Sequence, residues 1–197
     1  MGKALSLIAE RCKQAIPMIN PRSIAPLLSA MSVVLAACDD RPTTVAHHYV
    51  EGAWSLAQGV MKDGPLLIVV EGNPFEAPAT QLESRIVQIM TDAVTWTATP
   101  RFTTDRALTT SDTLRIVITL NPLKGTGAPE QCMGQSRGGG PLPEGRLRII
   151  GTFCDAATLL VTVSGRAGDA VDLDNAQLTA LVQQMTLDML SPQQRNP

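Results

Sequence analysis

An uncharged apolar run near the amino terminus divides this chain into a basic, apolar head and an acidic body. The run spans residues 24–37, reads IAPLLSAMSVVLAA, and lies just after Arg22. As a helix it would extend about 21 Å at 1.5 Å per residue, which is shorter than the roughly 30 Å hydrocarbon core of a bilayer. A run of this length behind a basic residue is typical of a signal peptide rather than of a permanent membrane span.

The charge of the chain changes at the same place. Residues 1–37 hold four basic residues and one acidic residue, a net charge of +3, whereas residues 38–197 hold 12 basic and 17 acidic residues, a net charge of −5. A body of 160 residues has the size of one domain and can bury a core of its own. Because this body is acidic and the chain has only 3% aromatic residues, it lacks the basic surface and stacking platforms of a nucleic-acid binder, and we expect no nucleic acid as a partner.

The apolar run closes with Leu35, Ala36, Ala37 and Cys38. This ending resembles the lipobox of bacterial (Gram-negative) lipoproteins, in which a Leu and two small residues precede a Cys. The resemblance implies that a peptidase cuts between Ala37 and Cys38, that Cys38 receives acyl chains, and that these chains anchor the mature protein in a lipid bilayer. It covers about the first fifth of the chain. The alternatives are an ordinary secretory signal with a chance Cys, or an uncleaved anchor.

The same resemblance places the mature protein in the bacterial cell envelope, facing the periplasm. In enteric bacteria an Asp after the lipidated Cys resembles a signal for retention in the inner membrane, and Asp39 occupies that position. The rule does not hold in all Gram-negative groups, so inner and outer membrane both stay open. The segment before the apolar run is long for a leader, and translation from Met18 instead of Met1 would give a compact one.

Two cysteines remain for the exported body once Cys12 and Cys38 are assigned to the leader and the anchor. Cys132 and Cys154 would meet an oxidising compartment, where two remaining thiols usually form a disulfide. Closing the loop between them would contribute about 3.4 kcal/mol in the chain-entropy estimate. No His stands at ligand spacing from them, so we predict a disulfide in preference to free thiols, and no metal site.

The remaining sequence predicts one α+β domain over residues 45–197, joined to the anchor by a tether over residues 38–44. We expect a mostly antiparallel sheet of about four strands with two to three helices packed on one face. Hydrophobic periodicity assigns the elements: helices over 45–61, 80–95 and 178–190, strands over 66–71 and 114–120, and a hairpin formed by 145–153 and 158–164.

Several polar motifs have a functional reading and a simpler structural one. Ser136 lies in a G-x-S-x-G pattern, but glycines and prolines follow it where a nucleophile elbow needs a helix. His47 and His48 are adjacent and would not converge on a metal from a helix. The acidic residues Asp169, Asp172 and Asp174 resemble half of a calcium loop, and we expect them to cap a helix instead.

Arg146 and Arg148 alternate along a predicted strand, so their guanidinium groups should share one face. Together with Arg137 they could receive an acidic partner or a lipid headgroup, and a solvated sheet face is the simpler reading. Four methionines in the predicted helices are expected to fill the core rather than to line a binding groove; they are Met61, Met90, Met185 and Met189.

No constellation in the body indicates a reaction, a cofactor or a catalytic residue. We therefore expect a membrane-anchored envelope lipoprotein with a non-catalytic periplasmic binding or interaction domain. One alternative is an accessory subunit of an envelope transport or assembly complex. A less favoured alternative is a hydrolase that uses Ser136.

Overall fold

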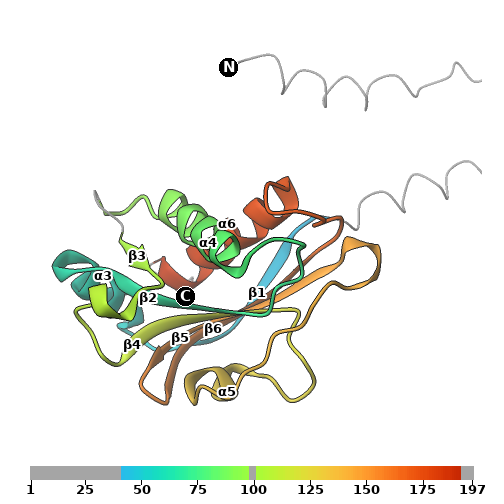
Figure 1. Cartoon of the computed structure of the whole chain (residues 1–197). Coiled ribbons are helices and arrows are strands. Elements are labelled where there is room, and N and C mark those ends of the chain that lie inside the picture. Colours follow the sequence, from blue (N-terminus) through green and yellow to red (C-terminus); the bar gives the residue numbers. More distant parts are fainter. Residues whose placement is uncertain (1–40, 98–100, 192–197) are drawn as a thin grey trace, which may run out of the picture. The chain divides into compact units, whose positions relative to one another are not determined.

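The computed structural model describes residues 41–97 and 101–191, which form an α+β domain with a six-stranded sheet (Figure 1). The predicted cleavage and lipidation site at Ala37 and Cys38 lies outside the described residues, as do residues 38–40 of the predicted tether. Among the residues that are described, no helix is long and apolar enough to cross a bilayer.

Strands and helices are interspersed along the chain. The strands are β1 (Thr43–Tyr49), β2 (Leu66–Glu71), β3 (Phe102–Thr103), β4 (Leu114–Leu120), β5 (Leu147–Asp155) and β6 (Thr158–Ala167). The helices are α3 (Ala53–Asp63), α4 (Ala79–Ala93), the short α5 (Ala128–Cys132) and α6 (Ala176–Leu190). Two 3₁₀ turns, η2 (Arg106–Leu108) and η3 (Pro143–Gly145), lie in the connections.

The predicted class is confirmed, but the sheet is larger than predicted and mixed rather than mostly antiparallel. The strand order is β1-β6-β5-β4-β2-β3, with antiparallel pairing from β1 to β4. β2 runs parallel to both β4 and β3. The parallel pair follows from the chain order, because β2, α4 and β4 form a crossover, and a crossover returns the second strand in the direction of the first. β3 has only two residues, too few for a periodic pattern.

The predicted helix over 45–61 is wrong in its first part. Residues 43–49 form β1, an edge strand, and the helix begins only at Ala53. Gly52 between them has φ of 89°, a left-handed conformation that glycine adopts without steric cost. β1 also begins two residues before the predicted start of the domain. Its side chains are mostly exposed, so the strand lacks the apolar alternation that marks a half-buried one.

Helices α3, α4 and α6 cover one face of the sheet (Figure 1). Apolar side chains of β2, β4, β5 and β6 alternate toward these helices and form the core with them. The four methionines expected in the core are buried there. Gly151 on β5 lets α6 approach closely, since a Cβ at this position would lie 2.6 Å from Met185 Sδ.

Of the helices within the described ranges, the short α5 alone lies on the opposite face (Figure 1). The predicted disulfide is present between Cys132 at the end of α5 and Cys154 on β5. Beside it, the buried Gln131 donates hydrogen bonds to Thr119 Oγ1 and to the carbonyls of Val117 and Ile150. A covalent bond and a buried polar network therefore hold α5 on the central strands β4, β5 and β6, and on this face the exposed ends of β5 and β6 beside β1 lie beyond α5.

Candidate functional site

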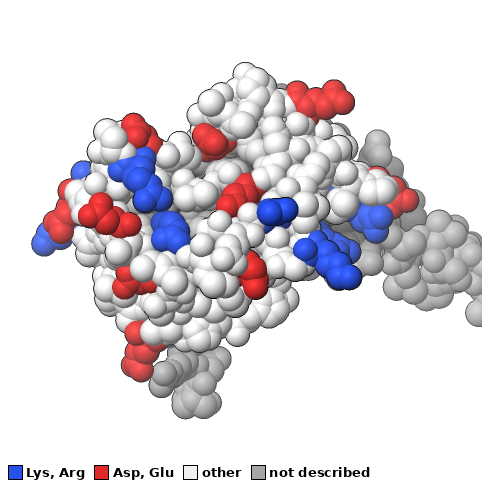
Figure 2. Space-filling model, turned by 60° about the horizontal axis from the view of Figure 1, so that its bottom comes forward, with Lys and Arg blue, Asp and Glu red and all other residues white. Residues whose placement is uncertain are grey.

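The open part of the sheet carries a group of arginines. Arg148 on β5 and Arg166 on β6 are directly opposite each other in the antiparallel register, and both are exposed. Arg41, two residues before β1, and Arg146, one residue before β5, lie beside them. These four residues, which we call the arginine cluster, line a hollow of about 270 Å³. Figure 2 shows Lys and Arg side chains gathered at the right-hand side of the face that this view brings forward.

The arginine cluster has little acidic compensation within the described ranges 41–97 and 101–191. Among the described residues, the one ion pair that involves the cluster joins Arg146 Nε to Glu144 Oε2 at 3.9 Å. Both side chains are more than half exposed, and such surface pairs contribute little. Like charges directly opposite on neighbouring strands destabilise a sheet. An anion bound between Arg148 and Arg166 would relieve that repulsion, so the cluster is suited to binding anionic groups.

Asn121 connects the cluster to the loop rich in Gly and Pro. Its side chain donates from Nδ2 to the carbonyl of Gly140 at 2.8 Å and accepts the backbone N–H of Arg148 at 2.9 Å. Asn121 itself has φ of 46°, a conformation that Asn tolerates better than most residues. A second hollow, of about 370 Å³, lies between this loop, Arg146 and Arg148. The loop is therefore held against the start of β5, where it extends the surface of the cluster.

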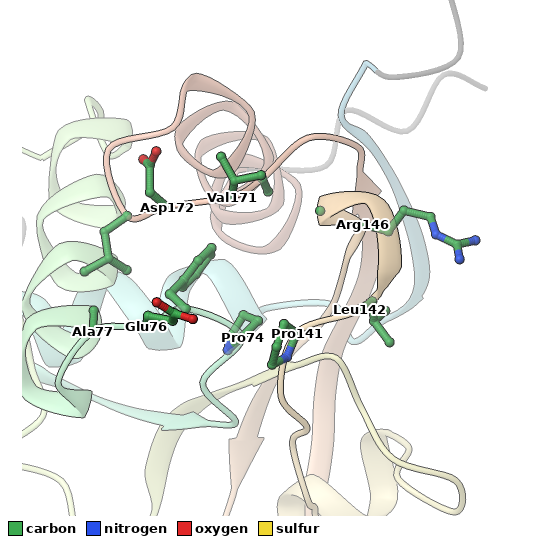
Figure 3. Close-up of a pocket in the computed structure, with 12 residues that line it drawn as sticks. Pro74, Glu76, Ala77, Pro141, Leu142, Arg146, Val171 and Asp172 are labelled. Carbon is green, nitrogen blue, oxygen red and sulfur yellow. The ribbon is translucent and has the colours of Figure 1, made fainter.

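A groove of about 470 Å³ lies between three loops and adjoins the cluster at Arg146 (Figure 3). Its lining is mainly apolar, from Pro74 and Phe75 after β2, from Pro141 and Leu142, and from residues 170–173 before α6. Glu76 and Asp172 bring carboxylates to its margin, while Arg146 directs its guanidinium group away from it in Figure 3. An apolar groove with acidic margins can accept an apolar or basic peptide segment.

The structure does not bring Ser136 together with a base. Its Oγ is buried and has no hydrogen-bond partner, and the residue lies in the loop after α5 rather than between a strand and a helix. His47 and His48 lie on β1, where His47 Nε2 is 2.6 Å from Ser164 Oγ. The G-x-S-x-G match is therefore not arranged as a nucleophile elbow.

The acidic residues before α6 do not cap it. Asn175 is the N-cap and accepts a hydrogen bond from the backbone N–H of Gln177. Asp172 accepts from the backbone of Asp174, and Asp174 lies 3.9 Å from Arg85 Nε. In the described part of the chain, no three His, Cys, Asp or Glu residues come together as a metal site.

Sequence reasoning found half of the arginine cluster. It placed Arg146 and Arg148 together, and both line the same hollow. Arg137 was grouped with them but lines a different hollow, beside Lys124 and Glu130. Arg41 and Arg166 were missed. Arg166 could have been found by extending the predicted hairpin two residues beyond 164, because its register places Arg166 opposite Arg148.

Comparison with known proteins identifies no family for this chain. No family model matches it, and no curated protein matches it. Among solved structures, a dodecamer of a single-substitution variant of PelC from Paraburkholderia phytofirmans has a TM-score of 0.39 at 12% identity, covering 78% of this chain and 99% of that one. A second PelC dodecamer from the same organism has a TM-score of 0.37 at 14% identity, with the same coverage.

Proposed function

We propose that this chain is an envelope lipoprotein, anchored to a bilayer through acylated Cys38, whose periplasmic domain works by contact rather than by catalysis. The lipobox residues 35–38 support the anchor. The anchor requires two acyl chains to be stable, because each buried methylene contributes only about 0.8 kcal/mol and a single chain binds reversibly.

The observation that carries the proposal is the disulfide between Cys132 and Cys154. Disulfides persist in exported proteins and are rare in the reducing cytosol. Both cysteines are buried and they close the loop that lies beside the arginine cluster. This feature of the body is independent of the leader, and both point to export across the inner membrane.

The surface of the domain supports a role in contact. The groove around Pro74 and Pro141 is apolar with acidic margins, whereas the arginine cluster is basic. Two surfaces of opposite character suit a protein that contacts two different partners. An accessory subunit of an envelope transport or assembly complex would use the groove to contact a partner protein. Its complex with integral membrane proteins should then survive mild detergent.

The anchor is tested by replacing the proposed lipidation site. In cells fed labelled palmitate, Cys38→Ala should abolish labelling and leave a precursor of unchanged size, because the acyl acceptor and the cleavage signal are both lost. Cys12→Ala is the matched control: it removes a cysteine that lies in the leader and should not alter labelling or processing. Continued labelling of the Cys38→Ala protein would refute the proposal.

A further inference from the structure

We propose that the arginine cluster binds the anionic phospholipid headgroups of the membrane that holds the anchor. The open end of the sheet, where Arg148 and Arg166 are paired, would then face the bilayer. This inference rests on the proposed function, because it requires acylation at Cys38. It adds an orientation and a lipid preference that the anchor alone does not provide.

The length of the chain between the anchor and the cluster limits how far apart they can be. Arg41 follows Cys38 by three residues, and a fully extended chain spans at most about 3.6 Å per residue. The two Cα atoms are therefore at most about 11 Å apart. The polar headgroup layer on each side of a bilayer is roughly 5–8 Å thick. Once Cys38 is acylated, Arg41 is held within or just above the headgroups.

The other three arginines of the cluster lie close to Arg41, so they reach the headgroup layer together with it. Arg41 lines the same hollow as Arg146, Arg148 and Arg166. Arg148 and Arg166 are paired between β5 and β6, and Arg146 directly precedes β5. A contact of the hollow with the bilayer therefore needs no rearrangement of the domain. The anchor converts what would be a weak encounter into an intramolecular one with a high effective concentration of headgroups.

The chemistry of the cluster fits phosphate groups. A guanidinium offers a planar fork of donors that matches phosphate oxygens in bidentate fashion. Phosphates placed between Arg148 and Arg166 would screen the repulsion of the pair. The body has a net charge of −5, so an anionic bilayer repels the rest of the domain and favours the one orientation that presents the cluster.

Acidic residues near the cluster work against this attraction. Asp39 and Asp40 precede Arg41, and Glu144 lies beside Arg146. By count the four arginines exceed these three acids by one charge. The orientation should therefore depend strongly on each arginine, and on the fraction of anionic lipid in the membrane.

The test measures how close the cluster comes to the lipid surface. The acylated, mature protein is placed in vesicles of phosphatidylcholine alone or with added phosphatidylglycerol. A fluorophore is attached at Thr43→Cys, opposite Arg166 on β1, and quenching by a headgroup spin label is recorded. A label at Leu108→Cys is the control, because this exposed residue follows β3 at the other edge of the sheet.

We expect quenching at residue 43 to rise with phosphatidylglycerol and to exceed that at residue 108. Each arginine near an anionic surface favours contact about fivefold, so Arg148→Gln with Arg166→Gln should lower the ratio of contacting to free domain about 25-fold. Arg106→Gln with Lys124→Gln removes the same charge from exposed positions outside the cluster. This matched pair should leave the quenching unchanged.

Two outcomes would overturn the inference: quenching that is equal in both kinds of vesicle, or an equal loss in the two double variants. A protein partner at this surface would give the first of these. The mass of each purified protein reports acylation separately. If Cys38 carries acyl chains and the quenching does not change with phosphatidylglycerol, only this inference fails. If Cys38 carries none, the proposed function fails and the inference with it.

Discussion

Replacing Gln131 by Met tests whether the polar network under α5 stabilises the domain. Gln131 is fully buried, and its amide group accepts a hydrogen bond from the Thr152 hydroxyl while donating toward three oxygens. An NH₂ group has two protons, so the three donor contacts, two near 2.9 Å and one at 3.2 Å, amount to two full bonds. Met has a similar length and can fill the site without hydrogen bonding.

The expected loss follows from counting these bonds. Gln131→Met removes two donated bonds and one accepted bond, each contributing about 0.5–1.5 kcal/mol net. The Thr152 hydroxyl keeps an alternative partner in Thr162 Oγ1 at 3.2 Å, which limits the penalty for an unsatisfied group. We therefore expect the free energy of unfolding to fall by about 3 kcal/mol, equivalent to a decrease of roughly 6–12 °C in Tm for a domain of this size.

Urea unfolding followed by far-ultraviolet circular dichroism measures this change, with the disulfide intact in every sample. Gln135→Met is the matched control because Gln135 is exposed in the loop that follows α5. Surface substitutions of this kind usually change stability by less than about 0.5 kcal/mol. If Gln131→Met and Gln135→Met unfold within about 0.5 kcal/mol of each other, the network does not stabilise the domain and the bond count is wrong.

Two further predictions concern the loop beside the cluster. Replacing Cys132 and Cys154 by Ser should lower the free energy of unfolding by about 3 kcal/mol, because the disulfide closes a loop between residues that are 22 positions apart. Urea unfolding measures this change, and an unchanged urea midpoint would contradict the prediction. Gly138→Ala should lower Tm, because its Cβ would lie 2.3 Å from the carbonyl oxygen of Glu71 and overpacking costs about 1–3 kcal/mol. Gly140→Ala, which has open space, is the control, and equal Tm values would refute the reasoning.

Long periodic segments were predictable from the sequence. α4 and α6 have an apolar stripe that must face a core, and β2 and β4 are short runs of branched apolar residues, so local pattern and tertiary burial agree. β1 gave no such pattern, because an edge strand over an open sheet face buries few side chains. Its identity as a strand depends on pairing with β6, whose residues are 112 or more positions away in the chain, and a local sequence window does not contain that information.

The cluster was predictable only in part, for a related reason. Alternation within one strand placed Arg146 and Arg148 together, which is local information. The position of Arg166 depends on the register between β5 and β6, and that of Arg41 depends on β1 being a strand. A cluster of side chains from several strands can be predicted only when the register of each strand pair is known.

Burial distinguishes the side chains that support folding from those that are available for contact in this domain. On the helix-covered face, side chains such as Ile116 and Phe153 are fully buried, and their loss would cost stability. The arginine cluster on the other face has exposed side chains and, within the described ranges, one weak ion pair. The like charges of Arg148 and Arg166 therefore oppose folding slightly rather than support it. Substituting Arg148 or Arg166 should therefore leave the free energy of unfolding unchanged or raise it slightly. A loss of membrane contact in these variants would then reflect the surface itself and not a damaged fold.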